Sequence, residues 1–278
     1  RRLRAPEWNG GGTVSTDEHR SAVRALTLLN PRLTYHRAAI VHAERIPESG
    51  GCVIVSNHGR LDFDSFILLR LMLRTRGRLV RLMADHLWFR IPLVDRVFAA
   101  AGAVDGTREN ALELLGRGEA VLTYPGGVRE IFGSRFRREH VDWHGRRGFA
   151  HVAITAGVPV IPVAGIGVNS GHIFVSSGRL LGTLLFRGLL RLGPEYADYR
   201  DPLTIGLLPI PLPFGIAVSL PLPCRVTYVV GEPLLPPAIP VGTEVPPQAV
   251  EDFAELVIES LRGVIREHGR PREESASD

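Results

Sequence analysis

Short apolar runs alternate with segments of helical pattern along this chain, and this alternation limits the folds open to it. Residues 52–56 (CVIVS) are almost wholly apolar, which is typical of a strand buried on both faces of a sheet. Strands that alternate with helices favour an α/β architecture. We therefore predict an α/β sandwich in which helices flank a mostly parallel or mixed central sheet.

The alternation predicts six strands and six helices. The strands cover residues 38–43, 52–56, 79–84, 119–124, 158–163 and 226–230. The helices cover residues 16–29, 63–73, 86–100, 107–115, 146–156 and 251–267, and Asn30-Pro31 ends the first of them. We expect a helical segment over 1–33, one α/β domain over 34–268 and a disordered tail over 269–278.

The composition suits a lipid surface better than DNA. All 33 basic residues are arginine, the formal net charge is +4, and 45% of the residues are hydrophobic. Arginine offers a fixed charge and a bidentate fork that suits phosphate. The arginines at 74, 76, 78 and 81 have no aromatic residues between them for base stacking, so we expect no nucleic-acid partner.

Cysteine content and one oily stretch bear on metal binding and location. With only Cys52 and Cys224, neither a disulfide framework nor a cysteine-rich metal site is available. Residues 203–223 carry no charge over 21 residues, but five prolines interrupt any helix there. We expect a lipid-dipping loop or a covered edge, and a peripheral position at the cytoplasmic face of a membrane.

The strongest local motif is SNHGRLDFDSF, residues 56–66, at the end of the predicted buried strand. His58 stands at the strand tip, where a rigid scaffold and an open side suit catalysis. Asp62 and Asp64 follow, and either carboxylate could hold the imidazole as a general base. Either could equally cap the helix that begins near Phe63.

A second motif is YPGGVRE, residues 124–130, which follows another predicted strand. Backbone at Gly126 and Gly127 can approach a ligand closely and aim amides into a pocket. Arg129 adds a fixed positive charge, which Glu130 could hold in place. An ordinary tight turn with a surface ion pair explains the same residues.

A third motif, residues 102–110, brings Arg108 to the start of a predicted helix. Phosphate or a developing oxyanion is readily held at such a helix N-terminus. Simple capping by Thr107 explains the pattern equally well. The sequence contains no G-x-S-x-G elbow, Walker loop or H-E-x-x-H motif, so we expect no resident metal or cofactor.

Taken in order, these three motifs and the VPVIP strand at 158–162 resemble the four-block signature of the glycerolipid and lysophospholipid acyltransferase superfamily. The resemblance covers residues 37–233. The chain has H-G-x4-D in place of H-x4-D, and P-G-G-x-x-E in place of F-P-E-G-T-R. Both departures are similar to the monoacylglycerol and diacylglycerol acyltransferase-like branch.

The resemblance implies an acyltransferase domain over 34–268. Acyl-CoA or acyl carrier protein would donate a fatty acyl group to a hydroxyl of a glycerolipid or lysophospholipid at a membrane surface. His58 would be the general base and Asp64 its partner, with Asp62 as the rival. The implied substrate-binding residues are Arg108, Gly126, Gly127, Arg129 and Glu130.

The missing acid of the F-P-E-G block makes a neutral acylglycerol a stronger candidate acceptor than lysophosphatidate. Two other functions stay open. One is a non-catalytic lipid-binding or membrane-interaction protein with the same fold. The other is a lipid hydrolase in which His58 and Asp64 activate water.

Overall fold

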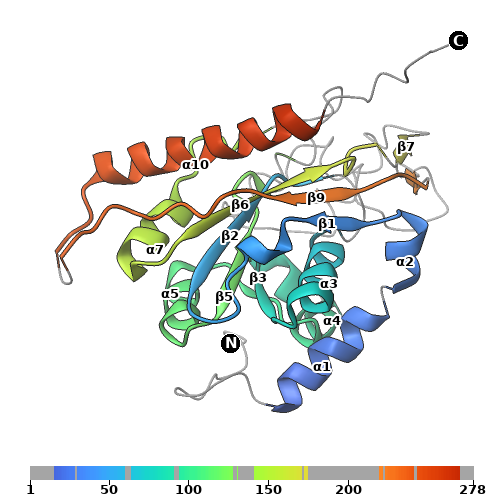
Figure 1. The fold of residues 1–278 in the computed structure, drawn as a ribbon. Coiled ribbons are helices and arrows are strands. Elements are labelled where there is room, and N and C mark those ends of the chain that lie inside the picture. The colour runs from blue at the N-terminus through green and yellow to red at the C-terminus, as the bar shows by residue number, and fades with distance from the viewer. Residues whose placement is uncertain are drawn as a thin grey trace, which may run out of the picture.

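A mixed β-sheet with helices on both faces forms the centre of the molecule (Figure 1). The computed structural model describes residues 16–28, 30–59, 64–90, 94–127, 130, 141–170, 172–174, 219–221, 223–240 and 243–269. The predicted α/β class with a mixed central sheet is confirmed.

Seven described strands build the sheet. In spatial order they are β1 (Ala39–Val41), β9 (Thr227–Val230), β6 (Val160–Ile166), β2 (Cys52–Ser56), β5 (Ala120–Thr123), β3 (Val80–Ala84) and β4 (Val104–Asp105). Neighbours pair in parallel except β6 and β9, which pair antiparallel. The short strands β7 (His172–Phe174) and β8 (Ser219–Pro221) form a separate antiparallel pair.

Helices form a layer on each face of the sheet (Figure 1). One layer holds α1 (Thr16–Thr27), α3 (Asp64–Arg76) and α4 (Val94–Ala100), and the other holds α5 (Arg108–Gly116), α7 (Gly148–Ala156) and α10 (Pro247–His268). The short elements are α2 (Asn30–Tyr35), η1 (Ala43–Arg45) and η2 (His86–Arg90).

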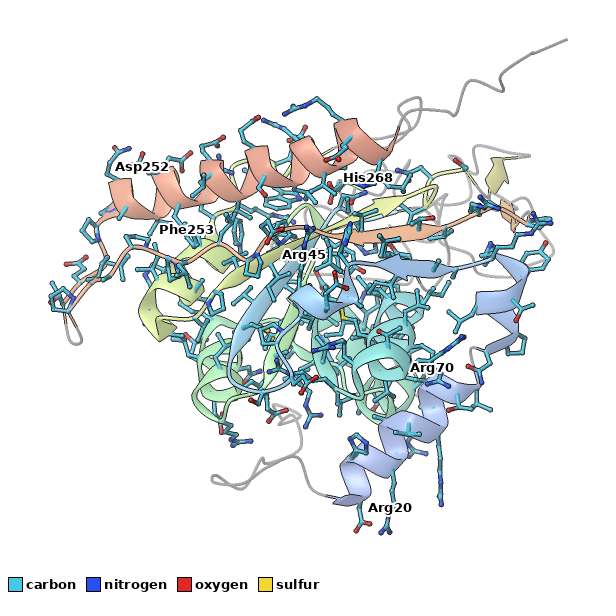
Figure 2. The ribbon with its side chains drawn as sticks, in the orientation of Figure 1. Arg20, Arg45, Arg70, Asp252, Phe253 and His268 are labelled. Atoms are coloured by element: carbon cyan, nitrogen blue, oxygen red, sulfur yellow. The ribbon has the colours of Figure 1, made fainter. Side chains whose placement is uncertain are left out.

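Alternating side chains of the central strands divide the core into two layers. Ile54 of β2 packs toward α3, whereas its neighbour Val53 packs toward α7 and α10. All five residues of β2 are buried, as their apolar pattern predicted. Figure 2 shows the same logic in amphipathic α10, where buried Phe253 faces the sheet and exposed Asp252 points away.

Two of the predicted helical regions differ from the observed helices, and proline explains both. The expected helix over 86–100 is divided into η2 and α4, and Pro92, which cannot donate a backbone hydrogen bond, lies between them in the sequence. The first helix ends at Thr27, and Asn30-Pro31 begins a second, short helix, α2. Proline is favoured in the first turn of a helix because its missing N–H needs no partner there.

Two arginines of the 74–81 cluster make contacts that stabilise the fold, and they are not placed to bind a ligand. Arg81 is 2% exposed, and its Nε lies 2.6 Å from Oε2 of Glu119, the residue before β5. Arg78 donates to the backbone carbonyls of Pro47 and Gly118. These contacts tie the amino ends of β2, β3 and β5 together.

Several sequence expectations concern residues outside the described ranges. These are residues 1–15, most of the stretch 203–223, and the tail from 270 to 278. None of the helices that the structure describes is both long enough and apolar enough to cross a membrane.

Candidate active site

The first two motifs meet at one edge of the sheet. β2 lies between β5 and β6 and runs parallel to both, so the carboxyl ends of all three strands point the same way. β2 leads into His58, β5 leads into the turn at Pro125, and β6 ends near Gly165. Ligand sites of open α/β sheets lie at this edge because strands deliver side chains there and loops leave room.

His58 and Asp64 are paired. Nδ1 of His58 lies 3.1 Å from Oδ2 of Asp64, and the two side chains are 21% and 2% exposed. Asp64 also accepts from the backbone amides of Gly59, at 2.9 Å, and Ser65, at 2.6 Å, at the start of α3. The carboxylate therefore serves the helix terminus and the imidazole together, and these donors offset the cost of its burial.

The pairing fixes which ring nitrogen of His58 points away from Asp64. Because Nδ1 faces a carboxylate, it is the nitrogen that carries the proton, and Nε2 on the opposite side of the ring is free to accept one. The ring of Tyr124 packs against the imidazole, with centroids 4.4 Å apart. Asp62, the rival partner, lies outside the described residues.

Two polar residues that sequence analysis did not single out hold this pair in place. The buried amide of Asn57 donates to the carbonyl of Gly165 at 3.0 Å and accepts from its N–H at 2.8 Å, which joins the end of β2 to β6. The Tyr228 hydroxyl donates to the backbone carbonyl of Asp64 at 2.9 Å. An asparagine at the end of an apolar strand was the available signal, because a buried amide must find partners.

Gly59 allows the close approach of the segment that follows β6. A Cβ at this position would lie 2.4 Å from Cβ of Val168 and 2.9 Å from its carbonyl oxygen. No side chain fits in that space without moving one of the two segments. The glycine of the H-G-x4-D motif thus has a packing role beside the His58–Asp64 pair.

The Pro-Gly turn is tighter than expected. Gly127 has a φ of 55°, and its N–H donates to the carbonyl of Tyr124 at 2.9 Å, so this amide is already used within the turn. Arg146, which sequence analysis did not single out, donates from Nη1 to the carbonyl of Gly126 at 3.2 Å. Arg129 lies outside the described residues.

Glu130 is buried behind His58. Glu130 is 2% exposed, and its Oε2 accepts the backbone N–H of His58 at 3.0 Å. Burial raises the pKa of this carboxyl well above its usual range, and the nearby Asp64 and Asp142 carboxylates add to the rise. The surface ion pair considered for Glu130 is therefore excluded.

Arg108 lies apart from the pair. It is exposed at the start of α5, after β4, and β4 is three strand positions from β2, or about 14 Å at the usual strand spacing. Thr107 caps the helix by accepting the N–H of Asn110 at 3.2 Å. Burial, and then the Arg108 guanidinium, lower the pKa of His151 on α7, so this charge faces α7.

Within the described residues no contact joins Arg108 to His58, Asp64 or Glu130. In the same part of the chain, no group of three His, Cys, Asp or Glu side chains is arranged to hold a metal ion. The site that the structure assembles is thus an imidazole–carboxylate pair, a Pro-Gly turn and a second, buried carboxyl.

Comparison with known proteins agrees with this arrangement. Residues 37–165 match the model of the Acyltransferase family, and that span contains the His58–Asp64 pair and the Pro-Gly turn. This part of the chain is similar to the Acyltransferase family.

Relatives of this chain are known in animals. The chain is 32% identical over 236 residues to "DGAT1/2-independent enzyme synthesizing storage lipids" of Bos taurus, which covers 85% of this chain and 61% of the relative. The Homo sapiens protein of the same name is also 32% identical over 236 residues, covering 85% of this chain and 63% of the relative. The chain thus spans about three-fifths of the length of these relatives.

A solved structure is also similar to this chain. It is the crystal structure of the 1-acyl-sn-glycerophosphate acyltransferase PlsC from Thermotoga maritima, with a TM-score of 0.48 and 16% sequence identity. The match covers 91% of this chain and 80% of that chain.

Gly59→Ala tests the close approach of the segment that follows β6. The added methyl overlaps Val168. We therefore expect the free energy of unfolding, measured in urea, to be about 1–3 kcal/mol lower than in wild type. Gly116→Ala is the matched control, because nothing lies within 4 Å of a Cβ there. Equal stability of the two variants would contradict the packing role of Gly59.

The buried carboxyl of Glu130 makes the stability of the protein depend on pH. Its folded pKa is raised, so above the usual carboxyl range the unfolded chain releases this proton first, and stability falls as pH rises toward the folded pKa. Glu130→Gln has no such proton. We expect urea unfolding to show wild type losing stability relative to Glu130→Gln as pH rises above the usual carboxyl range. A constant difference would contradict a neutral Glu130.

Proposed function

We propose that this chain transfers a fatty acyl group from acyl-CoA, or from an acyl carrier protein, to a hydroxyl of a glycerolipid or lysophospholipid. The observation that carries the proposal is the 3.1 Å contact between His58 and Asp64, within the span that matches the Acyltransferase family. The names of the relatives, which refer to storage lipids, support an acylglycerol as the acceptor.

In the proposed reaction His58 acts as general base. Nε2 takes the proton of the acceptor hydroxyl, and the oxygen attacks the thioester carbonyl of the donor. Asp64 stabilises the imidazolium that forms. The tetrahedral intermediate then breaks its C–S bond, the leaving thiolate takes the proton from the imidazolium, and the products are an ester and a free thiol.

The remaining roles are proposed from the turn, from the order of the strands and, for Arg129, from the sequence alone. The Gly127 amide is used within its turn, so the Gly126 amide and Arg129 are the proposed donors to the oxyanion. Arg108 stands about 14 Å from the strand that carries His58, by strand spacing. In acyl-CoA the phosphates lie at the other end of the pantetheine arm from the thioester, so Arg108 suits a phosphate anchor rather than an oxyanion donor.

We also propose that the protein works at the cytoplasmic face of a membrane as a peripheral protein. The net charge of +4 and the uncharged stretch 203–223 support this, because both favour an anionic, oily surface. Among the described residues, Leu28 and Val97 are large apolar side chains that are 81% and 56% exposed. Co-sedimentation with anionic but not with neutral liposomes is the expected result.

His58→Ala tests the mechanism. Loss of a general base is expected to lower the rate of transfer by about 100-fold or more. The measurement uses labelled acyl-CoA with mono- and diacylglycerols and lysophospholipids as acceptors. His268→Ala, an exposed histidine near the end of α10, is the matched control and should keep full activity.

Full transfer activity in His58→Ala would contradict the mechanism. Liposome binding without release of free thiol from any donor in wild type would instead favour a lipid-binding protein. Release of free fatty acid without an acceptor would favour a hydrolase.

A further inference from the structure

Two positions of the Pro-Gly turn compete for one volume. A Cβ built on Gly126 would lie 2.4 Å from Oε2 of Glu130 and 2.5 Å from its Cβ. The Glu130 carboxyl therefore occupies the space that a side chain at position 126 would fill. Gly126 is not among the residues with positive φ, so its backbone would accept a side chain if the space were free.

The same carboxyl holds the catalytic candidate from behind. Oε2 of Glu130 accepts the N–H of His58 at 3.0 Å, and the Glu130 N–H turns back to the carbonyl of Gly126 at 3.4 Å. One helical turn thus connects the two positions. An acid at 126 and an acid at 130 can reach the same backbone amide, but they cannot be present together.

We propose that Glu130 is a positioning residue that fixes the backbone of His58, and that it supplies from position 130 the carboxyl that an acid at position 126 could supply instead. The role rests on the proposed acyl transfer by His58. It differs from substrate binding, because a carboxyl in a residue that is 2% exposed has almost no surface to offer a lipid.

The surroundings of Glu130 favour a neutral carboxyl that acts by hydrogen bonding. Among the described residues, the carboxylates of Asp64 and Asp142 and the hydroxyl of Tyr124 lie close enough to Glu130 to interact with it electrostatically. The amide of His58 donates to Oε2, which lowers the pKa of the carboxyl but does not outweigh its burial. A glutamine, whose amide oxygen also accepts the His58 N–H, should replace it.

The exchange has a consequence for the acceptor. The absence of the F-P-E-G acid was the ground for doubting an anionic acceptor. If Glu130 restores the carboxyl at the same place, the turn does not discriminate between neutral and anionic acceptors. The preference then has to come from residues that touch the lipid.

The test moves the acid along the turn. Glu130→Gly removes the carboxyl and should lower kcat by about 10-fold or more with little change in KM for the donor, because His58 loses its support. Glu130→Gln should stay within about 3-fold of wild type. In the double variants Gly126→Asp/Glu130→Gly and Gly126→Glu/Glu130→Gly, kcat should recover at least about 5-fold over Glu130→Gly.

An aspartate at position 126 has the right length for this exchange. Its carboxylate oxygen lies about 2.4 Å from its own Cβ by standard bond lengths, which matches the 2.4 Å between a Cβ on Gly126 and Oε2 of Glu130. Gly126→Asp alone, with Glu130 in place, should lower the melting temperature, because the two side chains overlap. This readout needs no activity and separates failure of the geometry from failure of the proposed function.

Three results would overturn the proposal. The first is a raised KM with unchanged kcat in Glu130→Gly, which indicates substrate binding. The second is folded double variants that are no more active than Glu130→Gly. The third is a melting temperature of Gly126→Asp equal to that of wild type.

Discussion

The hydrogen bond between His58 and Asp64 is the contact on which the site depends. A carboxylate that is 2% exposed is costly unless donors surround it, and here an imidazole, two backbone amides and the start of α3 do so. The same arrangement fixes the ring. The backbone on either side of the pair is held by hydrogen bonds made by Asn57, Tyr228 and Glu130. Each of the three helps to keep His58 and Asp64 in the paired geometry.

Buried polar groups are divided between the two ends of the strands. At the amino ends, Arg78, Arg81 and Glu119 tie β2, β3 and β5 together, and they serve stability. At the carboxyl ends, Asn57, Asp64 and Glu130 surround His58. Parallel strands make this division possible, because β6, β2, β5, β3 and β4 run the same way and deliver their carboxyl ends to the same edge, where loops can shape a site.

The apolar pattern of β2 and its neighbours was enough to predict the α/β class and the strand that carries His58. Local chemistry also predicted the cap at Thr107. The pattern could not show that Arg78 and Arg81 face inward, because the sequence around a charged residue does not reveal which distant group will pair with it. It also could not show that Glu130 lies behind His58, since 72 residues separate them. Such contacts follow from the order of strands in the sheet.

The central claim is that Asp64 fixes the tautomer of His58, and nitrogen NMR of a ¹⁵N-labelled imidazole tests it most directly. In the neutral ring of wild type we expect a proton on Nδ1 and none on Nε2, and we expect this bias to be lost in Asp64→Ala. A proton found on Nε2 of the neutral ring in wild type would contradict the account, because that nitrogen could not then take the proton of an acceptor.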